Sequence, residues 1–245
     1  MAKKKAPLEE RRNYNYRRNK KHPFWRFFNL FFRVALHKPK EIINLNDEPI
    51  ESKSLIVAPH HAKWGPVYFD VFFPCPTAKM GHHAMLGNYR SRYRYLSRVM
   101  YIQKCHRSKF RAYVPTIVEA LFSINSYRSM NFIPSYQDMR FMNTMKLASR
   151  LIDNDMPLLI FPEDSENGYL ERAEKYHGGF AVLAGYYNKT HENELPIYPV
   201  YYHIKKRKIV IGKKIYLSEL KGKNTDEIAE YFKDRVNELY DNYFK

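Results

Sequence analysis

Residues 157–165 read Pro-Leu-Leu-Ile-Phe-Pro-Glu-Asp-Ser, an apolar run that ends in a proline and two acids. A short apolar run of this kind is typical of a buried strand in a parallel sheet. Residues 54–58 repeat the pattern with Ser-Leu-Ile-Val-Ala and lead into Pro59, His60 and His61. Side chains just beyond the carboxyl ends of parallel strands line the binding site of an open α/β sheet. The two histidines and the two acids are therefore expected to share one site.

The rest of the chain alternates between helical and strand patterns. Apolar residues at helical spacing predict helices, and short β-branched runs predict strands. The predicted helices are 114–124, 139–152, 178–187 and 225–243, and the predicted further strands are 132–134, 196–202 and 208–211, the last two as a hairpin. This alternation predicts an α/β fold whose mixed, mainly parallel sheet is covered by helices. Residues 40–245 contain no internal repeat, so we expect them to form one domain.

Composition excludes several classes of protein. The 245 residues include 42 Lys and Arg against 25 Asp and Glu, which gives a formal net charge of +17. Cys75 and Cys105 are the only cysteines, so a disulfide scaffold or a cysteine metal centre is not expected, and the spacing of the histidines does not indicate a metal site. No apolar run reaches the roughly 18–20 residues that span a bilayer.

Residues 1–22 are predicted to be a mobile basic arm. Nine Lys or Arg fall within residues 3–21, and like charges at this density repel one another. Such an arm is expected to bind an anionic partner, and its charge alone allows lipid headgroups, nucleic acid or an acidic protein.

Residues 23–39 are predicted to form an amphipathic helix at a membrane interface. Ten of the thirteen residues 24–36 are apolar and six are aromatic, while Arg26, Asn29 and Arg33 fall on one narrow polar stripe. Pro23 suits the first helical position and Pro39 marks the end. Together with the basic arm, this pattern favours a peripheral or monotopic location on the cytoplasmic side of an anionic phospholipid membrane. The alternative is an ordinary core helix.

The predicted site suits direct acyl transfer. A histidine beside a carboxylate can take the proton of a hydroxyl that attacks a thioester, without a nucleophilic Ser or Cys. The chain lacks a GxSxG elbow, a GxxxxGK[ST] phosphate loop and a GxGxxG fingerprint, which weakens hydrolase, kinase and dinucleotide-binding interpretations. A histidine pair alone would more often be structural.

Three blocks in order resemble the glycerolipid acyltransferase family (lysophosphatidic acid acyltransferase-like). They are Phe-Pro-Glu-Asp-Ser at 161–165, Lys-Tyr-His-Gly-Gly-Phe at 175–180 and Leu-Pro-Ile-Tyr-Pro-Val at 195–200. Residues 55–64 resemble the strand and histidine block of that family, and residues 131–135 occupy the place of its second block. The chain is similar to a divergent member.

The resemblance implies a reaction and roles for named residues. His61 matches the catalytic base, Glu163 matches the Glu of the FPEG block that is linked to acceptor binding, and Trp64 matches the aromatic residue after the histidine. Acyl-CoA or acyl-carrier protein is implied as the acyl donor, and a lysophospholipid-type lipid at the membrane surface as the acceptor. No further cofactor is implied.

The sequence departs from the family pattern around these residues. Pro66 stands where the family has an Asp, and Asp164 and Glu166 replace the Gly and the Arg of the family's FPEG(T)RS block. We therefore expect Asp164 or Asp70 to orient His61. The added negative charge favours an uncharged hydroxyl or amine acceptor over a phosphate-bearing one. Further acceptor contacts are expected from Ser135, Tyr136, Arg140 and Ser165.

Residues 90–111 carry eight Lys or Arg and no acid, interleaved with tyrosines. This pattern suits single-stranded nucleic acid, the phosphates of CoA, an acidic carrier protein or lipid headgroups. We favour the last three, because no nucleic-acid motif accompanies the patch. Two rival interpretations remain: a non-catalytic basic protein that binds anionic membrane or nucleic acid, and a degenerate, inactive member of the family.

Overall fold

The computed structural model of the chain describes residues 23–60, 63–164 and 168–245. The predicted basic arm 1–22 lies outside these residues. Seven strands form one sheet in the order β1-β7-β6-β2-β5-β3-β4. The strands are β1 Glu41–Asn44, β2 Leu55–Val57, β3 Ala78–His82, β4 Phe132–Ser135, β5 Leu158–Ile160, β6 Ile197–His203 and β7 Lys208–Ile211. Every pairing is parallel except that of β6 with β7. The predicted mixed, mainly parallel sheet is confirmed.

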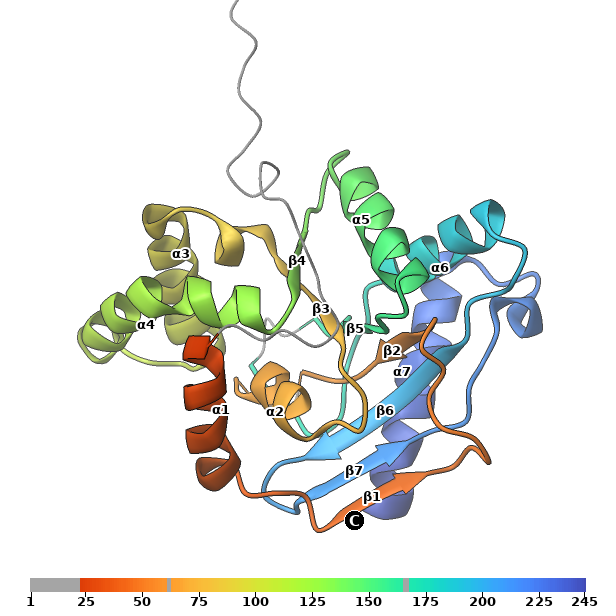
Figure 1. Cartoon of the computed structure of the whole chain (residues 1–245), viewed down its shortest axis with the longest axis horizontal. Coiled ribbons are helices and arrows are strands. Elements are labelled where there is room, and N and C mark those ends of the chain that lie inside the picture. The colour runs from red at the N-terminus through yellow and green to blue at the C-terminus, as the bar shows by residue number, and fades with distance from the viewer. Residues whose placement is uncertain (1–22, 61–62, 165–167) are drawn as a thin grey trace, which may run out of the picture.

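The helices are distributed over the two faces of this sheet (Figure 1). They are α1 Pro23–Ala35, α2 Gly65–Phe72, α3 Tyr89–Tyr95, α4 Lys109–Ser129, α5 Phe141–Asp153, α6 Gly179–Thr190 and α7 Thr225–Tyr243, and a π-helical segment, η2, continues α3 from Leu96 to Lys104. Single 3-10 turns occupy His83–Leu86 and Leu217–Leu220. None of the described helices is long and apolar enough to cross a membrane.

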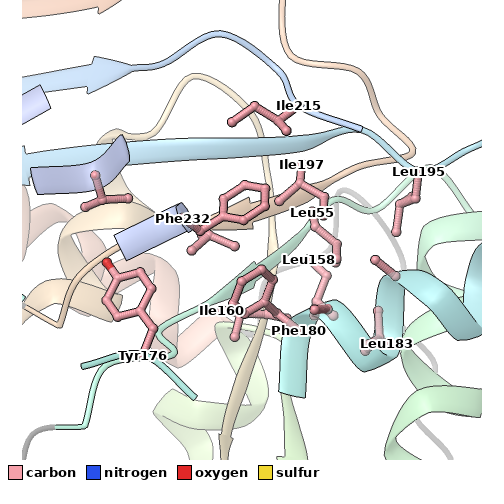
Figure 2. Packing of buried hydrophobic residues seen from close by; sticks show 14 of the residues in the cluster. Leu55, Leu158, Ile160, Tyr176, Phe180, Leu183, Leu195, Ile197, Ile215 and Phe232 are labelled. Carbon is pink, nitrogen blue, oxygen red and sulfur yellow. The ribbon is translucent and has the colours of Figure 1, made fainter. Parts of the chain in front are cut away.

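The main core lies between the sheet and α5, α6 and α7. Alternate residues of a strand point to opposite faces, so Leu55 and Val57 of β2 face these helices while Ile56 faces α2. Figure 2 shows Phe180 of α6 and Phe232 of α7 packed against the strand residues of this core. The two rings meet edge to face with centroids 5.2 Å apart. This apolar layer fixes the positions of the strand ends that carry the site.

The N-terminal helix is docked on the domain by one side only. Trp25 is 1% exposed, and its Nε1 donates a hydrogen bond of 2.7 Å to Oδ2 of Asp70 in α2. The other oxygen of Asp70 accepts from Nζ of the fully buried Lys79 at 3.0 Å. Removing either partner of such a buried ion pair leaves an uncompensated buried charge, which is strongly destabilising. On the outer side of α1, Arg33 Nε donates to Asn29 Oδ1 at 3.1 Å, as the polar stripe predicted.

Several boundaries differ from the sequence predictions. The helix predicted for 23–39 ends at Ala35, four residues before Pro39, and that predicted for 114–124 extends from Lys109 to Ser129. The hairpin of β6 and β7 and the helix at 225–243 are confirmed. Strands β1 and β3 and helices α2 and α3 were not predicted.

Candidate active site

Two neighbouring strand ends meet at the centre of the sheet. β2 pairs with β5 in parallel, with Val57 opposite Ile160. His60 follows β2 and Glu163 follows β5, and the backbone N–H of His60 donates to Oε2 of Glu163 at 2.6 Å. The predicted meeting of the two strand ends is thus observed for His60 and Glu163. The Glu163 carboxyl thereby holds the backbone at His60, the residue that precedes His61 in the sequence.

Glu163 is placed in an environment that disfavours its charged form. The side chain is 7% exposed, and this burial raises the pKa of Glu163 to about 7. The nearby carboxylates of Glu174 and Asp164 raise its pKa further, while the His60 N–H and Lys104 oppose the shift. A carboxyl with such a pKa exchanges its proton near neutral pH, which is the range in which general acids and bases work.

A large apolar cavity opens above these strand ends. Its volume is about 770 Å³, within the range of pockets that bind small molecules. His60 and Glu163 lie on its floor, and α1, α4 and η2 supply its walls. The wall residues include Phe28 and Phe32 from α1, Met100 and Tyr101 from η2, and Val114, Val118 and Phe122 from α4. A mostly apolar cavity with a few ionisable groups at its floor suits a long hydrocarbon ligand with a reactive polar end.

A polar cluster lies on one wall of the cavity. Lys63 Nζ donates to Tyr101 Oη and to Glu119 Oε2, both at 2.6 Å, and Tyr101 Oη donates to Glu119 at 2.6 Å. The ammonium of Lys63 also lies 4.1 Å from the centroid of the Tyr101 ring. Burial and the bond to Glu119 raise the pKa of Tyr101, so its hydroxyl stays protonated. The cluster joins the segment before α2 to η2 and α4.

The proposed base, His61, lies outside the described residues. The residues on either side of the gap, His60 and Lys63, both line the cavity. The ring of His60 lies between those of Phe161 and Tyr169, with centroid distances of 5.0 Å to each. His60 therefore has the surroundings of a packed side chain, which leaves its neighbour in the sequence as the candidate base.

Asp70 and Asp164, the two carboxylates expected to orient His61, have different surroundings. Asp70 is buried beneath α1, bonded to Lys79 and Trp25. Asp164 does not line the cavity, and its Oδ2 lies 3.8 Å from Nε2 of His177. Either role toward His61 stays a prediction.

The residues predicted to bind the acceptor are dispersed. Glu163 and Trp64 line the cavity, and the Trp64 ring lies 5.5 Å from that of Phe32 in α1. Ser135, Tyr136 and Arg140 do not line it. Arg140 instead pairs with Asp138 at 2.7 Å and stacks over the Tyr136 ring at 4.3 Å. Ser165 lies outside the described residues.

Sequence reasoning missed the cluster of Lys63, Tyr101 and Glu119. Tyr101 and Glu119 lie 38 and 56 residues from Lys63 in the sequence, so no local sequence pattern predicts that these side chains meet. One signal was present: Glu119 is the only acid between Asp70 and Asp138, in a strongly basic stretch. A lone acid in such a stretch is expected to have a cationic partner.

In the described part of the chain, no group of three or more His, Cys, Asp or Glu could hold a metal ion.

The apolar wall of the cavity continues onto the surface of the molecule. Val114, Val118 and Phe122 line the cavity and are each more than half exposed. The exposed face of α4 also carries Phe110, Tyr113 and Leu121, and α1, which contacts α4, exposes Phe27, Leu30, Phe31 and Val34. Figure 1 shows α1 and α4 side by side. An exposed apolar patch of this extent marks an interaction surface.

Comparison with known proteins finds similarity among solved structures alone. No family model and no curated protein matches the chain. Among solved structures, the 1-acyl-sn-glycerophosphate (LPA) acyltransferase PlsC from Thermotoga maritima aligns with 89% of this chain and 79% of its own chain. The identity is 13% and the TM-score is 0.48. A likeness at this level does not define a reaction, so the function has to be inferred from the residues of the cavity.

Proposed function

We propose that this chain is an acyltransferase that moves a fatty acyl group from a thioester to a lipid hydroxyl at a membrane surface. The observation that carries the proposal is the cavity of about 770 Å³, apolar in its walls, with Glu163 and His60, the residue before His61, on its floor. A fatty acyl chain buried there gains about 0.8 kcal/mol per methylene removed from water. The thioester end of the chain would then lie at the strand ends.

His61 is the proposed general base. Its imidazole takes the proton of the acceptor hydroxyl as the oxygen attacks the thioester carbonyl. The tetrahedral intermediate collapses, the C–S bond breaks, and the imidazolium returns the proton to the leaving thiolate. No acyl-enzyme forms. Glu163 is the proposed positioning residue, because its carboxyl holds the N–H of His60, which is next to His61 in the sequence.

The membrane is the proposed source of the acceptor. The apolar faces of α1 and α4 form one surface around the cavity wall, and exposed cations including Arg33, Lys38, Lys109 and Arg111 accompany it. An anionic phospholipid membrane fits both the apolar side chains and the positive charge. Docking there, on the cytoplasmic side, would let an acyl chain or a lysolipid enter the cavity without crossing water.

A panel of acceptors tests the proposal. The full chain is incubated with acyl-CoA or acyl-carrier protein and with lysophospholipids, monoacylglycerols and amines in vesicles, and the products are measured by mass spectrometry. We expect one acyl product that disappears in His61→Ala and persists in His106→Asn, a control at an exposed histidine outside the cavity.

The same experiment separates the rival interpretation. Vesicle binding should be unchanged in His61→Ala, because the apolar faces and the basic residues are intact. A wild-type protein that binds vesicles or RNA but forms no acyl product with any donor would instead be a non-catalytic basic protein or an inactive member of the family.

A further inference from the structure

A second cleft lies beside the cavity and has a different character. It has a volume of about 420 Å³ and is formed by α3, the start of η2 and the end of β3. Three arginines, Arg90, Arg94 and Arg98, line it. They recur every fourth residue and so follow one face of the helix for about 12 Å. Asn88 and Ser91 add polar side chains to the same cleft.

The outward direction of these arginines is fixed by a fourth one. Arg92 is 7% exposed, and its guanidinium donates to the Ala120 carbonyl at 2.9 and 3.1 Å and to the Gly87 carbonyl at 2.5 Å. Successive helical residues are about 100° apart, so positions two residues before and after Arg92 face away from it. Arg92 thereby anchors α3 to α4 and turns Arg90 and Arg94 toward solvent.

The three outward arginines have no acidic partner in the described part of the chain. Three arginines elsewhere do have one: Arg140 pairs with Asp138, Arg172 with Asp241 and Arg235 with Glu238. The sequence from 71 to 118 holds nine Lys or Arg and no acid, so the segments that form the cleft carry no carboxylate of their own. A row of guanidinium groups without a carboxylate partner is suited to phosphate oxygens.

The basic cleft adjoins the acyl cavity. His82 and Tyr95 line both, and their rings stack with centroids 4.5 Å apart. Burial, followed by the charges of His83 and Lys104, lowers the pKa of His82 to about 4. The shared wall is therefore neutral at pH 7, with positive charge on one side and apolar residues on the other. A ligand with an apolar tail and a polyanionic head would match both halves.

We propose that Arg90, Arg94 and Arg98 bind the phosphate groups of a coenzyme A thioester whose acyl chain occupies the large cavity. The inference rests on the proposed function and names its donor. Coenzyme A carries a diphosphate and a 3′-phosphate, so several phosphates meet several guanidiniums. A phospholipid headgroup offers one phosphate to the same row, and an acyl-carrier protein offers carboxylates on a helix surface, so both fit the row less well.

Titration calorimetry with two non-reacting probes tests the site. Coenzyme A and 3′,5′-ADP are titrated into the full chain and into the triple variant Arg90→Gln, Arg94→Gln, Arg98→Gln. The control variant is Lys213→Gln, Lys221→Gln, Lys223→Gln, which removes the same charge from exposed lysines outside both cavities. We expect the arginine variant to lose at least about ten-fold in affinity for both probes, and the lysine variant to match wild type.

Vesicle binding and donor choice decide the other outcomes. Phosphatidylglycerol vesicles should bind the arginine and lysine variants equally. A loss of vesicle binding in the arginine variant with unchanged coenzyme A affinity would overturn the proposal in favour of lipid headgroups. Wild-type protein that binds neither probe would overturn it too, while His61-dependent transfer from acyl-carrier protein would leave the proposed function standing. Arginine-dependent coenzyme A binding without transfer to any acceptor would contradict the proposed function alone.

Discussion

The two longest described helices, α4 and α7, are built in opposite ways. α7 buries large apolar side chains such as Phe232, Val236 and Leu239 against the sheet. Its outer face carries charged pairs such as Arg235 with Glu238. This is the pattern of a helix with water on one side and a core on the other.

α4 inverts that arrangement. Its buried positions include Ala112, Thr116 and Ser123, while Phe110 is 94% exposed. Between its charged ends, the outer face is also apolar, with Tyr113, Val114, Val118, Leu121 and Phe122 exposed. The difference indicates that the outer side of α4 is suited to contact with another apolar surface, whereas α7 contributes to the core.

The largest expected effect follows from the core side of this comparison. Phe232→Ala in α7 removes a fully buried ring that packs against Phe180, and it should lower the free energy of unfolding by about 3–5 kcal/mol. Val118→Ala on the outer face of α4 should change it by less than about 0.5 kcal/mol. Urea unfolding followed by circular dichroism measures both. Comparable losses in the two variants would mean that the outer face of α4 is covered in the folded protein.

The ionisable groups near α4 and those on α7 also differ in their exposure to water. The ion pairs of α7 are exposed, whereas the cavity beneath α4 holds a buried carboxyl at Glu163, whose pKa is raised to about 7. In the folded state Glu163 stays protonated up to about pH 7, whereas in the unfolded chain it ionises near pH 4.5. Its contribution to stability is therefore complete below pH 4.5 and is lost as the pH rises to 7.

Glu163→Gln should remove this dependence. The amide oxygen can still accept from the His60 N–H, so the hydrogen bond is retained while the ionisation is lost. Relative to the variant, wild type should lose about 3 kcal/mol of unfolding free energy between pH 4.5 and pH 7 and then level off. Urea unfolding at pH 4.5, 6 and 8 gives the difference. Parallel curves for the two proteins would show that the carboxyl is solvated.

The region around α7 was the more predictable of the two. The apolar spacing of 225–243 and the strand patterns of 157–161 and 196–202 gave elements close to those observed, because each buries a continuous apolar face. Strand β3 was not predicted because Lys79, although fully buried, interrupts the apolar run that indicates a buried strand. Helix α3 was missed because its arginines and tyrosines show no apolar period.

The candidate site also has a part that the sequence predicts and a part that it does not. His60 and Glu163 could be placed together from sequence, because parallel strands bring their carboxyl ends to one edge. The Lys63, Tyr101 and Glu119 cluster depends on how α2, η2 and α4 pack, and that packing has no local signature. The inward direction of Arg92 among outward arginines likewise follows from carbonyls of Gly87 and Ala120, which no sequence pattern reveals.

The exposed side of α4 gives the next prediction. Phe110→Ser with Leu121→Ser changes two side chains that do not line the cavity. If this face enters the bilayer interface, the double variant should lose about 2 kcal/mol of binding, or about thirty-fold in affinity for anionic vesicles. Its unfolding free energy should not fall. Co-sedimentation with phosphatidylglycerol vesicles measures the affinity.

Met139→Ser is the matched control for that experiment. Met139 is 96% exposed but precedes α5, away from the faces of α1 and α4. We expect its loss to leave vesicle binding unchanged. An equal loss in both proteins would mean that any exposed apolar side chain contributes, and the special place of α4 would disappear.

The smallest expected effect comes from exchanging residues between the inner faces of the two helices. Thr116 of α4 is fully buried, and its hydroxyl donates to the Ala112 carbonyl at 2.6 Å. Thr116→Val should change the free energy of unfolding by less than about 1 kcal/mol, because the bond is local to the helix. The reverse change in α7, Val236→Thr, brings a hydroxyl into an apolar layer and should cost about 1–2 kcal/mol. Equal effects in the two urea titrations would show that the inner face of α4 is as apolar as that of α7, and would leave only the outer faces to distinguish the helices.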